Sequence, residues 1–382
     1  MITSPHADLS RRVSSGRVLQ FAALVFCGVL PAVTVVVLFV GTIQDDSVAF
    51  DFRAFYRSAG AVLDGNSPYP PAADPLTAES GPYVYPPLPA LLAIPFRAIP
   101  LQPAGVVMML LLVGVVLATL RVLDIRDWRC YGVAFLWPPI LSAIQTGNLT
   151  LLLGLCAALS WRFRSRLMPT SSLVGVTLAA KFFLWPLVVW LGATRRLAAA
   201  GLSVAIGLGL LLLSWAAIGF AGIVDYPDLM TRLQDSIGDD SYTLHVVGLD
   251  LGLPHVVARA VWLAAGLVVL ASVVVVGRRG DERRAFVLAM AAALALTPIV
   301  WLHYFALLLV VVGLMRPRLG VVWFVPLAMV LTPGSGDPTP FETSWTLGVA
   351  AVTIALALRA SSGAEPASSD ASAARLALKG VT

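Results

Sequence analysis

Basic residues are distributed unevenly along this very hydrophobic chain, and their positions constrain how it can cross a membrane. Of the 26 lysines and arginines, 20 lie in short connections between apolar stretches, which hold Arg11, Arg12, Arg17, Arg121, Arg126, Arg129, Arg162, Arg164, Arg166, Arg195, Arg196, Arg278, Arg279, Arg283, Arg284, Arg316, Arg318 and the tail from Arg359. The remaining connections hold 6 basic residues but 14 of the 21 acids. Cytoplasmic loops are rich in Lys and Arg, so the acidic connections are expected outside the cytoplasm.

The composition is that of an integral membrane protein, with 58% hydrophobic and 12% charged residues in 382. The basic pI of 9.4 follows from arginines expected near anionic headgroups and gives no reason to expect a nucleic-acid partner. Cys27, Cys130 and Cys156 are isolated and lack metal-ligand spacing, so they predict core packing rather than disulfides or zinc.

The apolar stretches predict an all-α polytopic protein of about 12 transmembrane helices with both termini in the cytoplasm. The first span, 18–43, is too long for the apolar region of a cleaved signal peptide. The others are expected at 102–122, 131–144, 149–161, 167–180, 182–193, 199–224, 256–276, 285–300, 304–314, 321–331 and 345–358. Residues 1–360 would form the membrane domain, and the Ala/Ser-rich residues 361–382 a disordered cytoplasmic tail.

The first outer loop, 44–85, is longer than an ordinary connector, which is typical of functional loops. Within it, residues 51–63 carry apolar side chains at helical spacing, which predicts a short amphipathic helix lying on the membrane. The next stretch, 86–100, contains five prolines. If it crossed fully, the later arginine clusters would change sides, so it is expected to be re-entrant or interfacial.

Two ionisable residues fall between short apolar helices, where each needs a physical reason. Lys181 could snorkel to the surface from a helix end, or hold an anionic headgroup. His303 could cap a helical turn, or donate a hydrogen bond to a phosphate or a sugar hydroxyl.

Other polar candidates also have structural alternatives. Asp51 could merely cap its helix, but its neighbours Arg53, Tyr56 and Arg57 suggest a polar face. Gln145 and Asn148 could bond helix to helix.

The expected topology places all of these groups near one face. A carboxylate beside cations suits activation of a hydroxyl nucleophile, with the cations neutralising a phosphate leaving group.

Three sets of motifs in this chain resemble a known family. They are Asp51-Phe-Arg-Ala-Phe-Tyr followed by Tyr83-Val84-Tyr85-Pro86-Pro87, the turn Gln145-x-Gly-Asn148, and Lys181-x-x-x-x-Pro186 with Pro298-x-x-Trp301-x-His303. In matching order, these are similar to the motifs of the bacterial GT-C glycosyltransferases of family GT87. The chain departs from the family pattern at Tyr304, where a second His or polar residue is common, and at Thr146-Gly147.

The resemblance implies a GT-C fold and inverting transfer, without a metal or cofactor, from a polyprenyl-phosphate sugar to a glycolipid or polysaccharide on the extracytoplasmic face of the plasma membrane. The sugar would be mannose, as in the family's polyprenol-phosphomannose-dependent α-mannosyltransferases. Asp51 would be the general base. The candidate donor- and acceptor-binding residues are Arg53, Tyr56, Arg57, Tyr85, Gln145, Asn148, Lys181 and His303.

Two other functions would use some of the same sequence features. A flippase for lipid-linked sugars would favour repeated halves and ionisable residues at the bilayer midplane, whereas the acids of this chain lie in predicted loops. A non-catalytic subunit of an envelope-assembly complex would use the same polar turns only to pack helices.

Overall fold

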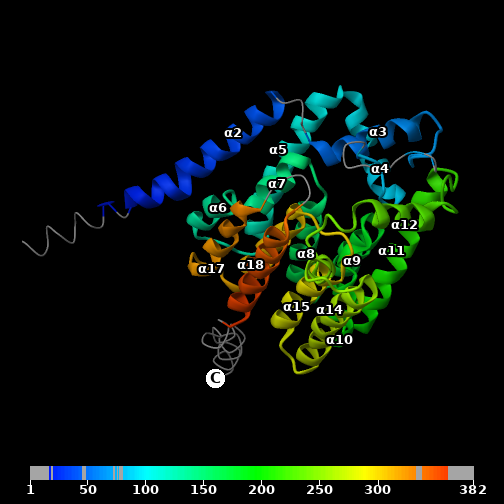
Figure 1. The fold of residues 1–382 in the computed structure, drawn as a ribbon. Helices are drawn as coiled ribbons and strands as arrows, with labels where there is room; N and C mark the ends of the chain where they lie inside the picture. Colours follow the sequence, from blue (N-terminus) through cyan, green and yellow to red (C-terminus); the bar gives the residue numbers. More distant parts are fainter. Residues whose placement is uncertain are drawn as a thin grey trace, which may run out of the picture.

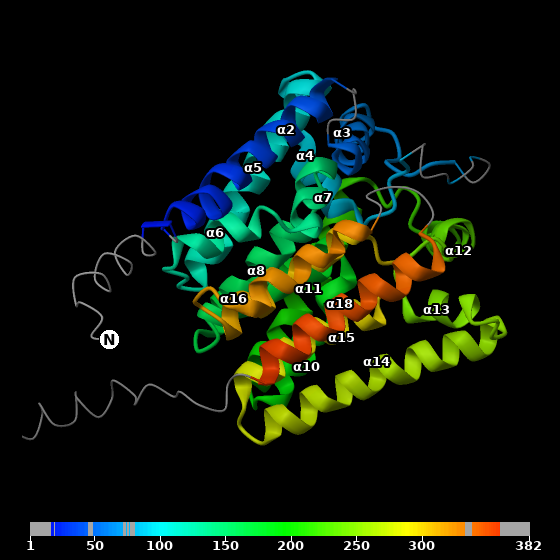
Figure 2. The same ribbon diagram turned by 60° about the vertical axis from the view of Figure 1, so that its left-hand side comes forward.

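The structure, a computed structural model, describes residues 17–18, 20–44, 49–71, 74, 76, 81–332 and 338–359. Every regular element in these residues is helical, which confirms the expected all-α class (Figures 1 and 2). The α-helices are α2 (Leu30–Gln44), α3 (Phe50–Leu63), α4 (Pro87–Ala93), α5 (Leu101–Val122), α6 (Trp128–Ala134), α7 (Pro138–Thr146), α8 (Thr150–Arg162), α9 (Leu167–Ala180), α10 (Pro186–Ala193), α11 (Leu197–Ala217), α12 (Tyr226–Ile237), α13 (Leu244–Asp250), α14 (His255–Arg278), α15 (Glu282–Leu296), α16 (Leu308–Met315), α17 (Val321–Phe324) and α18 (Pro340–Arg359). Shorter or differently wound turns are η1 (Val25–Val29), η2 (Ile94–Ala98), η3 (Phe182–Leu184), η4 (Leu302–Leu307) and η5 (Val325–Leu331).

Five helices in the described residues are long and apolar enough to cross a membrane: Gln20–Gln44, Leu101–Val122, Leu197–Ala217, His255–Arg278 and Pro340–Arg359. A sixth span is possible if α7 and α8, which meet at an angle of 116°, count as one. This finding supports a polytopic membrane protein but does not confirm the expected count of about 12. Several other expected spans are short helices, some of which begin or end beside proline.

Four basic connections meet at one end of the bundle. Arg164 Nε lies 3.4 Å and Arg196 Nη2 lies 2.8 Å from carboxylate oxygens of Glu282. Arg162 Nη1 donates to the carbonyl of Val122 at 3.2 Å. The connections α5–α6, α8–α9, α10–α11 and α14–α15 are therefore neighbours, as the charge pattern predicts. The side of the membrane that they occupy stays a prediction.

The other end of the bundle carries α3 and α12, far from α10 in both views (Figures 1 and 2). Helix α8 begins at this end, while α9, α11 and α15 end there, because each has its opposite terminus at a basic connection. The same short helices therefore join the arginine-rich end to the candidate site.

The first outer loop contains the expected helix, but its apolar face is covered by protein. Phe52 and Phe55 are buried in α3, and the ring of Phe52 packs edge-on against Phe96 of η2, with centroids 5.0 Å apart. After α3, the chain turns into α4 and η2, whose twelve residues are too short to span a bilayer. This agrees with the expectation that 86–100 does not cross.

The acidic connection 225–255 was expected to be a loop, and that expectation is wrong. It folds into α12 and α13, and α12 begins with Pro227 in its first turn, where proline is favoured. The predicted tail, 361–382, lies outside the described residues, so the division into two regions stays a prediction.

Candidate active site

The start of α3 is fastened to the turn between α7 and α8. Ala49, which precedes the helix, has a left-handed backbone with φ 48°, and its amide donates to the carbonyl of Gln145 at 3.1 Å. Asp51 lies in the first turn of α3 rather than at its N-cap, so the capping alternative is wrong. Its side chain is 23% exposed and faces a cavity.

Asn148 holds the carboxylate of Asp51. Its Nδ2 donates to Asp51 Oδ2 at 2.7 Å. Its Oδ1 accepts from the amide and the hydroxyl of Thr150, at 2.9 and 2.7 Å. Because both ends of the amide are engaged, the orientation of Asn148 is fixed, and Asp51 is placed by a buried network.

His303 approaches the same carboxylate from the C-terminal part of the chain. Helix α15 ends at Leu296, and the irregular residues 297–301, which include Pro298, lead into η4. His303 Nε2 lies 3.8 Å from Asp51 Oδ2, which is too long for a hydrogen bond. This nitrogen is buried and has no hydrogen-bond partner among the described residues. It is therefore available to a polar group that enters the cavity.

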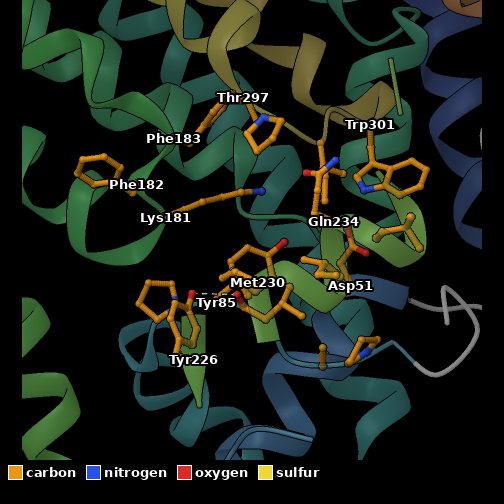
Figure 3. Close-up of a pocket in the computed structure, with 18 of the residues that line it drawn as sticks. Asp51, Tyr85, Lys181, Phe182, Phe183, Tyr226, Met230, Gln234, Thr297 and Trp301 are labelled. Carbon is orange, nitrogen blue, oxygen red and sulfur yellow. Dashed lines mark hydrogen bonds between the residues drawn. The ribbon is translucent and has the colours of Figure 1, made fainter. Parts of the chain in front are cut away.

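Lys181 is the cation of the site. It follows α9 with an extended backbone, and its Nζ donates to the hydroxyl of Tyr304. The same nitrogen lies 3.9 Å from the ring centroid of Tyr304 and 5.0 Å from that of Tyr85. Figure 3 shows the side chain extending into the cavity, toward the side that holds Asp51 and Trp301. This placement disagrees with the snorkelling alternative for Lys181.

These groups line one cavity of about 880 Å³, in the upper part of the usual range for ligand sites. Its polar part is formed by Asp51, Tyr85, Asn148, Lys181, His303 and Tyr304. Most of its remaining lining is apolar or aromatic. It comes from Leu76, from the segments 81–86 and 296–301, and from α11, α12, η3 and the end of α9, as with Leu178, Phe182, Leu212, Trp215, Met230 and Ile237. The site therefore suits an amphipathic ligand with an anionic or hydroxyl-bearing head and a hydrocarbon part.

Four candidate residues are not brought into this cavity lining, as far as the described chain shows: Arg53, Tyr56, Arg57 and Gln145. The Tyr56 hydroxyl donates to the carbonyl of Ile99 at 2.8 Å, and the guanidinium of Arg97 covers its ring. Arg57 and Gln145 are exposed. Binding roles for these four residues stay predictions.

Helix α12 supplies a cavity wall that the sequence pattern did not reveal. Tyr226, Met230, Leu233, Gln234 and Ile237 all line the cavity (Figure 3 labels three of them). Their spacing of three and four residues marks one helical face and was readable in the sequence. The acidic residues between them favoured the loop interpretation.

The chain matches the model of a known protein family. The family model described as Glycosyltransferase family 87 matches residues 83–302, which is more than half of the chain. The matched range includes Tyr85, Asn148 and Lys181 and ends one residue before His303, whereas Asp51 lies 32 residues before its start. No curated protein and no solved structure matches this chain.

Proposed function

This chain belongs to glycosyltransferase family 87, a family of membrane glycosyltransferases, and we propose that it transfers mannose from a polyprenyl-phosphate donor to a glycolipid or polysaccharide acceptor. The observation that carries this proposal is the meeting of Asp51, Asn148, Lys181 and His303 at one end of a largely apolar cavity. A sugar bound to a lipid phosphate needs polar groups around its sugar and phosphate and an apolar surface along its lipid chain.

The apolar walls support a lipid-linked rather than a nucleotide-linked donor. The prenyl chain would lie against Leu178, Leu212 and Phe182, whose side chains offer no hydrogen bonds. The phosphate would meet Lys181, whose ammonium group lies against the rings of Tyr304 and Tyr85 and would gain an anionic partner there. A free nucleotide would leave most of this apolar lining unused.

In the proposed reaction, the acceptor hydroxyl attacks the anomeric carbon of the donor from the face opposite the phosphate. Asp51 takes the hydroxyl proton as general base. The described hydrogen bond and the histidine contact of this carboxylate both involve Oδ2, which leaves Oδ1 to receive that proton. The bond between the anomeric carbon and the phosphate oxygen breaks, and the polyprenyl phosphate leaves with the electron pair, neutralised by Lys181.

His303 would hold the reacting groups in place. It lines the cavity, and its buried Nε2 lies 3.8 Å from Asp51 Oδ2 without a hydrogen-bond partner among the described residues, so it could donate to a sugar hydroxyl or a phosphate oxygen. The reaction itself needs no redox step and no external electron source. Single displacement inverts the configuration at the anomeric carbon.

The test is transfer by the purified full-length protein in detergent, using synthetic polyprenyl-phosphate-mannose and a panel of glycolipid acceptors. Asp51→Asn keeps the shape of the side chain but removes the base, so transfer should fall by about 10²- to 10⁴-fold. Asp64→Asn is the matched control, because Asp64 lies at the exposed end of the same helix. Equal turnover by the native protein and Asp51→Asn would remove Asp51 from its role.

Donor panels separate the finer claims. Transfer from polyprenyl phosphate carrying another sugar, without transfer from the mannose donor, would overturn the mannose assignment alone. Movement of the donor between leaflets of proteoliposomes without any transfer would favour the flippase alternative instead.

We further propose that the cavity opens on the extracytoplasmic side of the plasma membrane. The support is that four arginine-bearing connections gather at the opposite end of the bundle. Ser236→Cys on exposed α12 should react with a membrane-impermeant maleimide added to intact cells, whereas Arg279→Cys should react only after lysis. The reverse pattern would overturn the orientation.

A further inference from the structure

Three residues with metal-ligand side chains meet between α12 and α14. Asp239 follows α12, His245 is the second residue of α13, and His255 is the first residue of α14. One potential ligand atom from each lies within 4.8 Å of the others. None of the three lines the cavity described above, so within the described structure this cluster is separate from the candidate active site.

The central imidazole of this cluster is buried and incompletely bonded. The side chain of His245 is 8% exposed, and its Nδ1 finds no hydrogen-bond partner in the part of the chain that the structure describes. Its Nε2 lies 3.8 Å from Asp239 Oδ1, beyond hydrogen-bond length. Nε2 is therefore the nitrogen that could share an ion with Asp239, whereas the unpartnered Nδ1 lies on the other side of the ring.

We propose that Asp239, His245 and His255 bind one Zn²⁺ ion. Two imidazoles and a carboxylate are a ligand set that zinc accepts, with bonds of about 2.0–2.2 Å. In tetrahedral geometry such bonds place neighbouring ligand atoms about 3.3 Å apart. The observed 3.8 Å between His245 and Asp239 is close to that separation. Asp239 is 61% exposed on its side chain, so it is free to close the difference by rotation.

The ligand types favour zinc over the harder cations. Mg²⁺ and Ca²⁺ prefer several oxygen ligands, whereas this cluster offers one carboxylate and two nitrogens. Arg259, one helical turn after His255, adds positive charge that acts on His245. A site that relied on charge attraction alone would be weakened by this arginine, while coordination by neutral imidazole depends less on net charge.

The framework that holds the two histidines is tightly packed. Helix α13 lies so close to α14 that a Cβ on Gly248 would come 2.8 Å from the Cβ of Ala258. The backbones that carry His245 and His255 are therefore fixed relative to each other, and the two ring centroids lie 5.9 Å apart. Asp239, in contrast, lies outside this pair of helices, in the segment that follows α12.

The proposed ion would brace a wall of the cavity. Asp239 is two residues beyond Ile237, the last residue of α12 and part of the cavity lining. Further along, the amide of Tyr242 donates to the carbonyl of Val300 at 2.8 Å, three residues before His303. Zinc would thus tie the end of α12 to α14, as a structural rather than a catalytic ion.

The experiment uses full-length protein without a polyhistidine tag, stripped with chelator in detergent and dialysed against Zn²⁺. Native protein should retain about one zinc per chain by elemental mass spectrometry, as a single built site requires. Asp239→Asn and His255→Gln change exposed side chains, so neither should disturb folding. Asp235→Asn, an exposed acid on α12 outside the cluster, is the matched control.

Competition with a chromophoric zinc chelator measures affinity. Asp239→Asn and His255→Gln should each bind zinc at least tenfold more weakly than the native protein. The double variant that combines these two substitutions should lose the site, and Asp235→Asn should match the native protein. Zinc should raise the Tm of the native protein and the control but not of the double variant. Co²⁺ should give the visible absorption of a tetrahedral or five-coordinate site only where zinc binds.

Two results would overturn the proposal. One is native protein that retains no more zinc than the double variant. The other is stoichiometric zinc binding that survives both substitutions, since the ion would then be held elsewhere. Either result leaves the glycosyltransferase proposal untouched, because its test measures sugar transfer.

Discussion

Asn148 and Asp51 are 97 residues apart in sequence, yet Asn148 Nδ2 donates to Asp51 Oδ2 at 2.7 Å. This bond joins the first turn of α3 to the turn between α7 and α8. A carboxylate held in this way keeps one orientation before any substrate arrives, which reduces the reorganisation needed during reaction. The proposed base is therefore placed by the turn between α7 and α8 rather than by its own helix alone.

Thr150 is expected to be a positioning residue, because its hydroxyl and amide hold Oδ1 of Asn148. Thr150→Val removes the hydroxyl and keeps the shape, so one buried hydrogen bond is lost, at about 1 kcal/mol. We expect kcat to fall by about fivefold, with the KM for the donor little changed. Thr150→Ser should restore kcat. A purely structural role would lower the Tm without this split between kcat and KM or the rescue by serine.

Lys181 is expected to contribute mainly to binding of the donor phosphate. Lys181→Met removes a cation that faces the cavity, and charge-assisted hydrogen bonds are worth about 1.5–3 kcal/mol. The affinity for polyprenyl phosphate should fall by about ten- to a hundredfold, and Lys181→Arg should retain part of it. Arg126→Gln, an exposed change at the arginine-rich end, is the control. Native affinity in Lys181→Met would contradict the assignment.

Gly147 is expected to tolerate no side chain. Its φ is +68°, and a Cβ there would come 2.8 Å from the Cβ of Phe52 and 2.9 Å from that of Ala49. Gly147→Ala should therefore push α3 away from the turn that holds Asn148, lowering both the Tm and the transfer rate. Gly209→Ala on α11 should be neutral or slightly stabilising, because a Cβ there meets nothing within 4 Å in the described residues. Equal effects of the two substitutions would refute this account.

Asp127 is expected to make the stability of the protein depend on acid pH. The Arg129 side chain, with backbone amides of Arg129 and Leu319, lowers the pKa of Asp127 to about 2 from its ordinary value of 3.8. Because the folded pKa is the lower one, the stabilisation is complete above about pH 4 and is lost as the pH falls toward 2.

Thermal unfolding in detergent at several pH values tests this expectation. Asp127→Asn should lower the Tm near pH 7, and its Tm should converge with that of the native protein as the pH approaches 2. A Tm difference that stays constant across this range would show that the charge of Asp127 is not responsible.

The gathering of Asp51, Lys181 and His303 could be predicted from the sequence because it follows from topology alone. Each lies at the end of an apolar segment whose other end carries arginines, and the arginines mark one side. The turn at Asn148 could also be predicted, because the apolar segment that follows it has arginines at its other end. Gly147 supplies the positive φ that ends α7. Helix α3 was predictable from its apolar spacing.

The rotation of α3 could not be predicted in the same way. Residues five apart on a helix point about 140° away from each other, so Asp51 and Tyr56 cannot both face one cavity. Tyr56 instead packs beneath Arg97 and bonds to Ile99. Which face of α3 meets the cavity depends on η2 and on the turn after α7, and these contacts are distant in sequence.

The span count illustrates another limit. Hydropathy identifies apolar stretches, but it does not tell whether a helix of 8–15 residues crosses a membrane or ends inside the protein. Helices α7 and α8 meet at 116°, so two expected spans share one buried bend. Helix α12 was not predicted, because the acidic residues on its exposed face make the segment polar overall. Its other face nevertheless carries regularly spaced apolar residues.

His303 and Tyr304 are consecutive residues of one short turn, yet they contact different partners, Asp51 and Lys181. Under the proposed roles, a single peptide unit links acceptor activation to recognition of the leaving group. A displacement of η4 would therefore misalign both halves of the chemistry at once. If related chains differ in sugar or acceptor preference, we expect the responsible substitutions on α12 and α11. Side chains there can change without moving His303 and Tyr304.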